Sequence, residues 1–562
     1  MLDRSRVPIG IDEFGKLRAQ GLFYIDKTRF IEQLIDNEGV EVFLFPRPRR
    51  FGKTLAMTML KAYFEKSPED RSAWFEGLHI WQAGPKYREH YQKYPLIYLT
   101  LKDVKEPTAE AFFGAMKILL ANLYLEHSSL LSDCVLSAME RARFEAILEG
   151  TATPELLKVA LRELCAYLHR AHKERVILLI DEYDAPIHEA YLKGFSDPIL
   201  DFFRRFLGSA LKSNPHLHKA VLTGILRISK ESIFSDLNNV RVCSILRKEY
   251  WDAIGFTESE VSGALEEAGM SDKLPEVRKW YNGYLFGGQV MYNPWSVLNY
   301  IASGGEALSY WVNTSANTLI KEALIRYAGR VGEEMETLLT GGEIERNLDE
   351  NTALGELNTN IEVLYSLLTF AGYLKARAIP SELSDRYALS IPNREVAVVY
   401  QKTFSGWLDM GLSAQGGDVR KLCAALFKGD AKGVEKQLQR LAAATFSYHD
   451  TAQPDPEKFY HGFVLGLLTT LEPEYRVRSN RESGDGRPDV LVIPAEKGKG
   501  GVVLELKVAE PDEQTLDEAL NEGEAQMKGK HYGTELMAQG VGSVVELVVA
   551  FDGKKVKVRR VM

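Results

Sequence analysis

The sequence of 562 residues predicts an α/β protein with an N-terminal parallel-sheet domain, a largely helical middle and a second α/β domain at the C-terminus. Three patterns lead to this fold class. An apolar run at residues 42–45 is followed by a Gly-Lys-Thr loop and a helical stripe. A second apolar run, at residues 176–180, ends in two acidic residues. Near the C-terminus, apolar runs at residues 490–493 and 502–506 carry acidic and basic residues. Because a chain of this length exceeds one core, we expect roughly three or four domains.

The composition is that of a soluble globular protein, with 45% hydrophobic and 26% charged residues. The longest apolar runs are well short of the ~20 residues that span a bilayer. The N-terminus opens on charged residues and lacks the apolar segment of a signal peptide. The four cysteines, Cys134, Cys165, Cys243 and Cys423, show neither metal-ligand spacing nor a disulfide framework. We therefore expect a cytoplasmic protein without a membrane partner.

The formal net charge of −9 argues against a protein that coats nucleic acid by bulk charge, but it leaves room for local basic surfaces. Residues 554–560 are one candidate, because a strand would place Val556 and Val558 on one face and cations on the other. An edge strand that is protected by its charge explains the same pattern equally well.

Gly52, Lys53 and Thr54 lie between the strand at 42–45 and a helix expected at 55–66, which is the context of a phosphate-binding loop. A helix N-terminus presents free N–H groups and the positive end of its dipole to phosphates. We expect Lys53 to reach the β- and γ-phosphates of ATP, and the Thr54 hydroxyl to bind Mg²⁺.

Arg47 occupies the position at which the standard loop has its first glycine. Pro46 and Pro48 flank it, and each proline fixes its own φ. Pro48 also pushes Arg47 toward extended geometry. We therefore expect this loop to fold differently from the glycine-rich version.

The strand at 176–180 leads into Asp181 and Glu182, at the sheet edge where ligands bind in open α/β sheets. We expect Asp181 to hold Mg²⁺ through water, and Glu182 to orient or deprotonate the attacking water. The plainer alternative is a buried strand that leaves the core through polar residues. A further strand at 220–225 makes Thr223 and Arg227 candidates for sensing the γ-phosphate, although threonine is common in strands.

Several motifs resemble the AAA-ATPase-like family of bacterial and archaeal proteins over about residues 7–300. They are Tyr24-Ile25-Asp26-Lys27-Thr28, Arg47-Pro48-Arg49-Arg50-Phe51-Gly52-Lys53-Thr54, Asp181-Glu182-Tyr183-Asp184, Ile233-Phe234-Ser235-Asp236-Leu237-Asn238-Asn239, and Trp280-Tyr281-Asn282-Gly283-Tyr284 with Tyr292-Asn293-Pro294-Trp295-Ser296. The arginine-rich loop is the most specific of them. The resemblance implies a P-loop ATPase in which Arg49 and Arg50 also contact the nucleotide.

The remaining N-terminal and middle elements follow from local patterns. Residues 23–25 form a short strand candidate, and a helix is expected from 26–28 through Ile35. A helix at 361–374 followed by a strand at 387–391 predicts a small winged-helix-like unit, which either binds DNA or forms the lid of the ATPase core. Glycines at 411–418 and prolines at 452–456 indicate linkers.

Aromatic residues cluster around turns at 280–286. They are Trp280, Tyr281, Tyr284 and Phe286. Such a cluster could stack nucleic-acid bases, but a packed subdomain is the favoured interpretation.

A second chemistry is predicted near the C-terminus. Asp489 opens one strand, and Glu505 and Lys507 alternate with leucines on the next, so that both project from one strand face. Asp489 can reach that face from the adjacent strand. The two carboxylates, with the Leu506 carbonyl, can hold Mg²⁺ or Mn²⁺, which would polarise a phosphodiester and help to generate hydroxide. Lys507 would position water or neutralise developing charge. A surface Glu–Lys pair on two edge-polar strands is the alternative.

Pro-Asp followed by Glu-x-Lys on an apolar strand resembles the PD-(D/E)xK nuclease superfamily, in particular the branch fused behind AAA-ATPase-like domains. Residues 459–463, Ala525 with Gln526, and His531 with Tyr532 fit the same branch. The resemblance to this branch implies that Glu457 is a carboxylate on a helix and that Gln526 is a helix glutamine near the site.

The predicted organisation is an AAA-like P-loop ATPase domain at 1–248, a helical lid and winged-helix-like region at 249–410, a helical linker at 411–455 and a nuclease-like domain at 456–562. We expect ATP and Mg²⁺ as cofactors, with Mn²⁺ as a further metal for the nuclease site. DNA is favoured over RNA as the partner, and a homo-oligomer is compatible with the sequence. The expected function is an ATPase coupled to a metal-dependent nuclease, by analogy in defence or mobile-element biology. The alternative is a nucleotide-controlled nucleic-acid-binding or scaffolding protein that does not cut.

Overall fold

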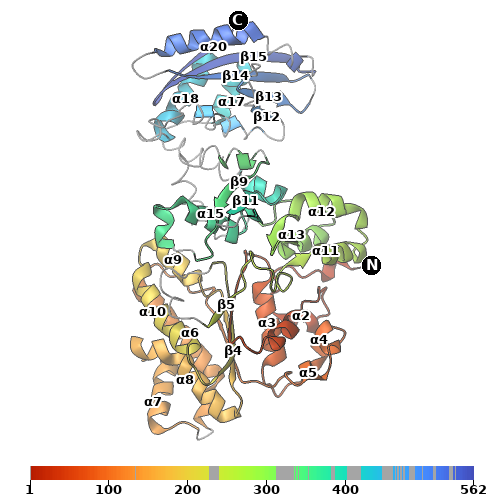
Figure 1. The fold of residues 1–562 in the computed structure, drawn as a ribbon, viewed down its shortest axis with the longest axis vertical. Helices are drawn as coiled ribbons and strands as arrows, with labels where there is room; N and C mark the ends of the chain where they lie inside the picture. The colour runs from red at the N-terminus through yellow and green to blue at the C-terminus, as the bar shows by residue number, and fades with distance from the viewer. Residues whose placement is uncertain are drawn as a thin grey trace. The chain divides into compact units, whose positions relative to one another are not determined.

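The computed structural model (Figure 1) describes residues 2–132, 135–226, 239–311, 334–335, 337–339, 341–351, 354–380, 386–400, 419–445 and, with interruptions, 460–561. The interruptions are 462–463, 465–466, 469–470, 472–474, 480–487, 497, 510–513, 531–535 and 538–539. Arg227, the motif at 233–238 and both predicted linkers lie outside the described residues. The chain divides into two compact units, residues 1–323 with 345–396 and residues 324–344 with 397–562. Each unit is described by itself.

The first unit is built on a five-stranded sheet of order β2-β3-β4-β1-β5, in which every pairing is parallel. Its strands are β1 (Val42–Pro46), β2 (Leu96–Thr100), β3 (Val176–Asp181), β4 (Leu217–Gly224) and β5 (Val240–Val242). β1 and β3 are buried along their whole length, as expected for parallel strands with helices on both faces. The predictions of β1, β3 and β4 are confirmed, whereas the short edge strand β5 has no counterpart among them.

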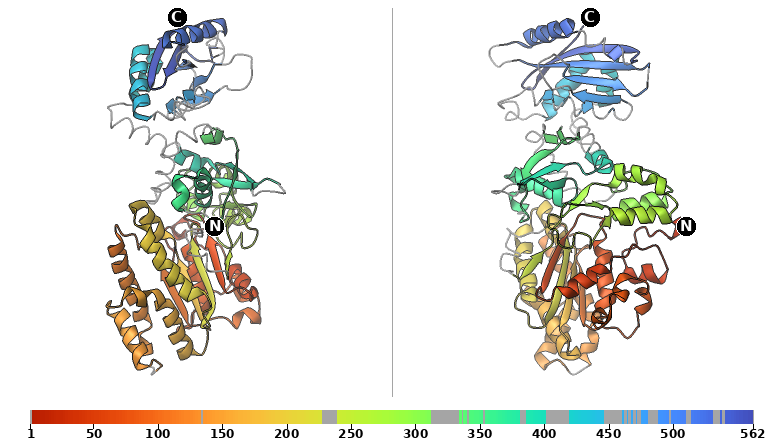
Figure 2. Two further views of the ribbon diagram at one scale, coloured as in Figure 1. Left: turned by 60° about the vertical axis from the view of Figure 1, so that its left-hand side comes forward. Right: turned by 45° about the vertical axis from the view of Figure 1, so that its right-hand side comes forward.

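Helices cover both faces of this sheet, with α6 to α10 on one side and α2 to α5 on the other (Figures 1 and 2). They are α1 (Phe14–Ala19), α2 (Arg29–Asp36), α3 (Lys53–Phe64), α4 (His79–Gln82), α5 (Pro85–Arg88), α6 (Ala109–Glu126), α7 (Ala138–Leu148), α8 (Pro154–His172), α9 (Ala185–Lys193) and α10 (Ser196–Leu211). The helix that begins at Lys53 directly follows the predicted phosphate-binding loop. Among the described residues, no helix has the length and apolar character needed to cross a membrane.

The predicted strand at residues 23–25 is wrong. This segment pairs with no strand, and Phe23 and Ile25 instead pack against the apolar cluster of the region that follows the sheet. The Phe23 N–H donates to the Arg6 carbonyl over 3.0 Å. Its apolar residues therefore reflect packing between parts of the chain that are distant in sequence.

A small subdomain follows the sheet. It consists of β6 (Phe256–Thr257), α11 (Glu258–Glu267), α12 (Leu274–Tyr281), β7 (Tyr284–Phe286), β8 (Gln289–Tyr292) and α13 (Pro294–Ala302), with strand order β6-β8-β7. Tyr281, Tyr284 and Phe286 are buried in it. These three rings therefore pack inside a subdomain, as favoured from the sequence, whereas Trp280 is half-buried and packs against the same apolar cluster.

Next come β9 (Ile344–Asn347), α15 (Ile361–Phe370), β10 (Lys375–Ala378) and β11 (Arg386–Ser390), with strand order β10-β11-β9. β10 and β11 are antiparallel, so the predicted helix followed by a hairpin strand is present. Its assignment as a winged-helix-like unit stays a prediction.

The second unit carries another five-stranded sheet, of order β12-β13-β14-β15-β16, in which only β14 and β15 are parallel within the described register. Its elements are α17 (Val419–Lys428), α18 (Ala431–Thr445), β12 (Tyr475–Ser479), β13 (Val490–Pro494), β14 (Gly500–Val508), α20 (Leu516–Lys530), β15 (Ser543–Asp552) and β16 (Lys555–Arg560). α17 and α18 pack on one face, and α20 packs on the other (Figure 1).

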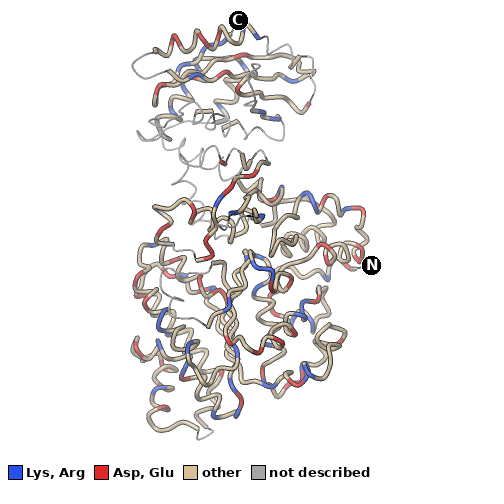
Figure 3. Tube along the Cα trace, in the orientation of Figure 1, with Lys and Arg blue, Asp and Glu red and all other residues tan. Residues whose placement is uncertain are grey.

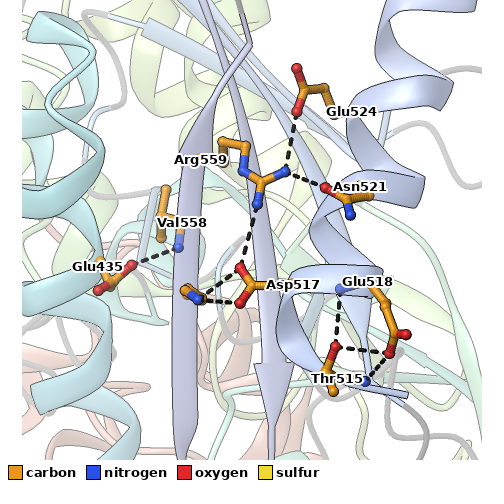
Figure 4. Close-up of polar contacts among 9 residues, drawn as sticks. Glu435, Thr515, Asp517, Glu518, Asn521, Glu524, Val558 and Arg559 are labelled. Atoms are coloured by element: carbon orange, nitrogen blue, oxygen red, sulfur yellow. Dashed lines mark hydrogen bonds and ion pairs between the residues drawn. The ribbon is translucent and has the colours of Figure 1, made fainter. Parts of the chain in front are cut away.

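The basic C-terminal segment is the edge strand β16. Val556 and Val558 are buried against α17 and α18, and the cations between them face α20. Lys557 pairs with Asp517 at 2.6 Å, and Arg559 contacts Asp517, Asn521 and Glu524 (Figure 4). Because these two cations are neutralised inside the unit, the edge-strand interpretation fits them better than a basic groove.

Candidate functional site

The loop between β1 and α3 has the backbone of a phosphate-binding turn. Gly52 has φ 90°, a left-handed conformation that a side chain would strain, and it caps the helix that starts at Lys53. The first N–H groups of α3 therefore stand free at the end of the loop. This is the arrangement that binds phosphate at a helix N-terminus.

Arg47, which stands in the place of the first glycine, is fully buried and points away from this turn. Its guanidinium donates to the carbonyls of Cys243 and Tyr250 over 2.6 and 2.8 Å and lies 5.1 Å from the Phe286 ring centroid. Burial lowers the pKa of Arg47 to about 10. Arg47 therefore connects the loop to the segment that follows β5. A glycine at this position could not make these contacts, which is why the loop differs from the glycine-rich form.

Lys53 is 5% exposed, and its ammonium donates to the carbonyls of Arg47 and Pro48, each over 3.1 Å. Burial lowers the pKa of Lys53, and the negative charges of Glu182 and Asp181 partly oppose that shift. The side chain thus curls over its own loop, close to the acids at the end of β3.

Asp181 is fully buried, and two residues that are far from it in sequence contact its carboxylate. The Thr54 hydroxyl donates to one carboxylate oxygen over 2.7 Å, and the Thr223 hydroxyl donates to the other. Carboxylate and hydroxyl oxygens side by side are the ligands that Mg²⁺ prefers, so the residues present fit that ion.

Glu182 follows with φ 52°, a left-handed conformation that is uncommon for a residue with a side chain. Its N–H donates to the Thr223 hydroxyl over 3.4 Å, and its side chain lines the pocket beside Lys53 and Thr54. A strained backbone that aims an acid into a pocket is a feature of functional sites.

A pocket of about 580 Å³ extends from this turn. All five loop residues predicted to contact nucleotide line it, namely Arg49, Arg50, Gly52, Lys53 and Thr54. Arg50 stacks on Trp295, with 4.3 Å from the guanidinium carbon to the ring centroid. Burial lowers the pKa of Arg49, and the negative charges of Glu182 and Asp184 partly oppose that shift. Thr223 does not line the pocket; its hydroxyl instead contacts Asp181.

The pocket is also lined by residues that have no predicted role, among them Asp184, His188, Trp311 and Tyr373. Asp184 accepts the N–H groups of Ile225 and Leu226 over 2.8 and 2.9 Å, so it holds the end of β4. It belongs to the Asp-Glu-Tyr-Asp motif, which was the available signal. Trp311 and Tyr373 come from segments with no motif, and only the fold brings them here.

The buried carboxylate of Glu395 holds residues beside the pocket through hydrogen bonds. Glu395 accepts the Trp311 N–H over 2.8 Å and the Ser296 hydroxyl over 2.8 and 3.0 Å. The Trp311 indole N–H and the Asn293 amide each donate to the Arg49 carbonyl over 3.4 Å. Burial raises the pKa of Glu395 to about 7.

We expect Glu395→Gln to flatten the pH dependence of stability. The ordinary pKa of 4.5 applies in the unfolded chain, so the folded state binds this proton more tightly, and stability falls as pH rises from about 4.5 through about 7. The loss is on the order of 3 kcal/mol. The variant keeps one neutral acceptor oxygen, which can take the place of the Glu395 oxygen that accepts both the Trp311 N–H and the Ser296 hydroxyl. Unfolding midpoints at pH 5 and pH 8 measure this, with the exposed Glu306→Gln as the control. An equal slope in both variants would contradict the assignment.

In the second unit, the residues predicted for the nuclease site come together. Glu505 is 1% exposed, and the Lys507 ammonium lies 3.5 Å from its carboxylate. Asp489 precedes β13, and its carboxylate accepts the Leu506 N–H over 2.7 Å. The Lys507 ammonium also donates to the Gln526 side-chain oxygen of α20 over 2.8 Å.

One oxygen of Glu505 is buried and has no hydrogen-bond partner among the residues that the structure describes. Burial, together with the charge of Asp489, raises the pKa of Glu505 to about 7, and Lys507 opposes the shift. An orphaned buried carboxylate oxygen beside a second carboxylate fits a divalent cation. In the described part of the chain, no group of three or more His, Cys, Asp or Glu residues is placed to hold a metal ion.

Two further residues shape this site. A Cβ at Gly523 would lie 2.5 Å from a Val548 methyl carbon and 3.2 Å from Lys507 Cγ, so glycine permits α20 to approach β14 closely. The His461 ring contacts the Asp489 carbonyl over 2.9 Å. His461 lies in the stretch at 459–463, but Gly523 had no sequence signal. Glu457, His531 and Tyr532 lie outside the described residues.

Comparisons with known proteins match the two regions of the chain that contain these residues. Residues 8–234 match the family model described as predicted AAA-ATPase, and residues 455–561 match that of the PD-(D/E)XK nuclease superfamily. A relative from Azotobacter chroococcum mcd 1, described as an uncharacterized protein in the vnfD 5′ region, is 29% identical over 560 residues, which are 96% of this chain and 95% of the relative. The alignment therefore includes both matched regions.

A solved structure of the Aeropyrum pernix ORC2 protein (ADPNP-ADP complexes) was also found. It is 10% identical and has a TM-score of 0.23, with 67% of this chain and 92% of that chain covered. A TM-score this low supports no structural inference.

Proposed function

We propose that this chain, in which a predicted AAA-ATPase domain precedes a PD-(D/E)XK nuclease-superfamily domain, binds and hydrolyses ATP in the first and cuts DNA phosphodiesters in the second. The observation that carries the proposal is the meeting of distant polar residues at both sites. Thr54 and Thr223 converge on Asp181, and Lys507 bridges Glu505 and Gln526.

At the first site, the N–H groups of α3 and the Lys53 ammonium would bind the phosphates of ATP. Thr54 and Asp181 would hold Mg²⁺, which neutralises charge on the phosphates when it is bound. Glu182 faces the same pocket and would orient the attacking water and accept its proton.

At the second site, Asp489 and Glu505 would hold Mg²⁺ or Mn²⁺, which polarises the phosphodiester and lowers the pKa of water when it is bound. The Lys507 ammonium would stabilise the negative charge that develops on the phosphate. Gln526 holds that ammonium in place through its side-chain oxygen.

A second candidate is a nucleotide-controlled protein that grips nucleic acid without cutting it. The observation in its favour is that, in the described part of the chain, no group of three or more His, Cys, Asp or Glu residues is placed to hold a metal ion. Incubation of the purified protein with plasmid DNA, single-stranded DNA and RNA, with and without ATP and Mn²⁺, separates the two. Metal-dependent cleavage supports the nuclease, and metal-independent binding without cleavage supports the alternative.

We expect Glu182→Gln to suppress ATP hydrolysis and leave ATP binding intact. The amide keeps the shape of the side chain but cannot accept the proton of the attacking water, and the loss of a general base typically lowers the rate by about 10²–10⁴-fold. Phosphate release in single-turnover assays measures hydrolysis, and calorimetry measures binding. Glu189→Gln is the matched control, because Glu189 also lines the pocket. Equal hydrolysis by wild type and Glu182→Gln would assign the base elsewhere.

A further inference from the structure

The edge strand β12 carries two exposed arginines, Arg476 and Arg478. They alternate with Tyr475 and Val477, which pack against the apolar core beneath α17 and α18. The arginines therefore project from the opposite face of the sheet.

That opposite face is the one that carries the candidate nuclease site. Arg476 pairs with Ile493 and Arg478 with Leu491, and both apolar partners belong to the cluster on the α20 side. Leu491 pairs in turn with Val503 on β14. Glu505 and Lys507 follow Val503 at intervals of two residues, so they project from the same face as the arginines.

The geometry of a sheet sets the separation. Arg478 is two strands away from β14, and Glu505 is two residues along β14 from the row that contains Arg478. With strands ~4.8 Å apart and ~3.4 Å per residue, the two Cα atoms are ~12 Å apart. One strand of B-DNA advances ~3.4 Å per nucleotide, so this distance corresponds to about three or four nucleotides.

The charge environment of the two arginines differs from that of several other cations in the unit. Lys499, Lys528 and Lys557 each pair with an acid at 2.9, 2.9 and 2.6 Å. Arg559 is neutralised by acids of α20, along which Figure 3 shows several Asp and Glu residues. Neither Arg476 nor Arg478 forms an ion pair with any residue that the structure describes. Two exposed guanidiniums that pair with no carboxylate in the described part of the chain suit phosphate oxygens, which they can bind through two hydrogen bonds each.

We propose that Arg476 and Arg478 bind the phosphodiester backbone of the nucleic acid about three or four nucleotides from the bond that is cut. This inference rests on the proposed nuclease function and adds the surface that positions its substrate. Contacts to the backbone set position and affinity without reading sequence. The edge strand therefore serves as an electrostatic guide that delivers a strand to Glu505 and Lys507.

The test measures binding separately from cutting. A fluorescently labelled DNA of 20 nucleotides, single-stranded or as a duplex, is titrated with the full chain in EDTA and followed by anisotropy at several salt concentrations. We expect the double variant Arg476→Gln/Arg478→Gln to bind about tenfold more weakly, and the slope of log K against log salt to become shallower by about two. Because both side chains are exposed, the variant should fold, which circular dichroism checks.

Lys432→Gln/Lys436→Gln is the matched control. Both lysines are exposed on α18, which covers the other face of the sheet, and the change in net charge is the same. The control should bind DNA within twofold of wild type. Equal weakening in the two double variants would mean that net charge alone matters, and this would overturn the inference.

Two other outcomes are informative. If the wild-type chain binds and cuts DNA while the arginine variant behaves like the control, the inference fails and the proposed function stands. If the wild-type chain binds no DNA, both fail. Poly-glutamate of similar charge serves as a competitor, and competition as effective as that of unlabelled DNA would identify a contact for acidic proteins, against the inference.

Discussion

Lys53→Ala is expected to abolish ATP binding. Its ammonium is the one cation of the Gly-Lys-Thr turn. It is buried, and we expect it to pair with the negative phosphates of ATP. Truncation of one partner of a buried, hydrogen-bonded charge pair costs about 2–5 kcal/mol. At the lower end this is about a thirtyfold loss of affinity, and at the upper end binding disappears. Calorimetric titration with Mg²⁺ and ATP measures it.

Lys61→Ala is the matched control for this prediction. Lys61 lies on the same helix, pairs loosely with Glu65 at 3.8 Å and does not line the pocket, so its loss should leave ATP affinity unchanged. If Lys53→Ala binds ATP as wild type does, the phosphate-binding role of the loop is refuted. Arg47 is no obstacle to binding, because its side chain is directed at the carbonyls of Cys243 and Tyr250.

The second large effect concerns Lys507. Lys507→Ala should lower the rate of DNA cleavage by about 10²–10³-fold, because it removes the charge that stabilises the developing phosphate anion. Mn²⁺ binding should change little, since an ammonium is no metal ligand. Asp489→Asn and Glu505→Gln should instead weaken Mn²⁺ binding itself. Asparagine keeps an oxygen that can accept the Leu506 N–H, so the loss would not stem from a broken backbone contact.

The measurements are plasmid nicking and Mn²⁺ binding by electron paramagnetic resonance. Lys528→Ala is the control, because Lys528 is an exposed cation paired with Glu524. Asp489→Asn should also keep its ATP turnover within a few-fold of wild type if the two sites act independently. Unchanged cleavage in all three active-site variants would assign the nuclease activity to a contaminant and favour the binding protein.

Local sequence patterns were sufficient to predict a strand and its candidate site residues where both lie within one short stretch of the chain. The apolar runs of β1 and β3 are long, purely apolar and followed by diagnostic polar residues, so they were predicted as buried strands. The Glu505–Lys507 alternation was visible in the same way, because the strand period of two assigns side chains to faces before any fold is known. Both candidate sites could therefore be named from the sequence.

Residues 23–25 show where such signals mislead. Their apolar character is real, but it serves packing against a distant cluster, and a propensity for strands cannot tell pairing from packing. The role of Arg47 was hidden for a related reason. Its partners are the carbonyls of Cys243 and Tyr250, about two hundred residues away, and backbone carbonyls leave no signature in a sequence.

The sequence by itself determined the residue types of both sites, the order of the domains and the strands that carry the acids. Only the tertiary structure decided which residues meet. Thr54 and Thr223 share Asp181 because β1, β3 and β4 are adjacent in the sheet, and strand order is not a local property. In the same way, Gly523 lets α20 approach β14, so that Gln526 reaches Lys507. Contacts of this kind depend on packing between elements distant in sequence, and local propensity contains no information about them.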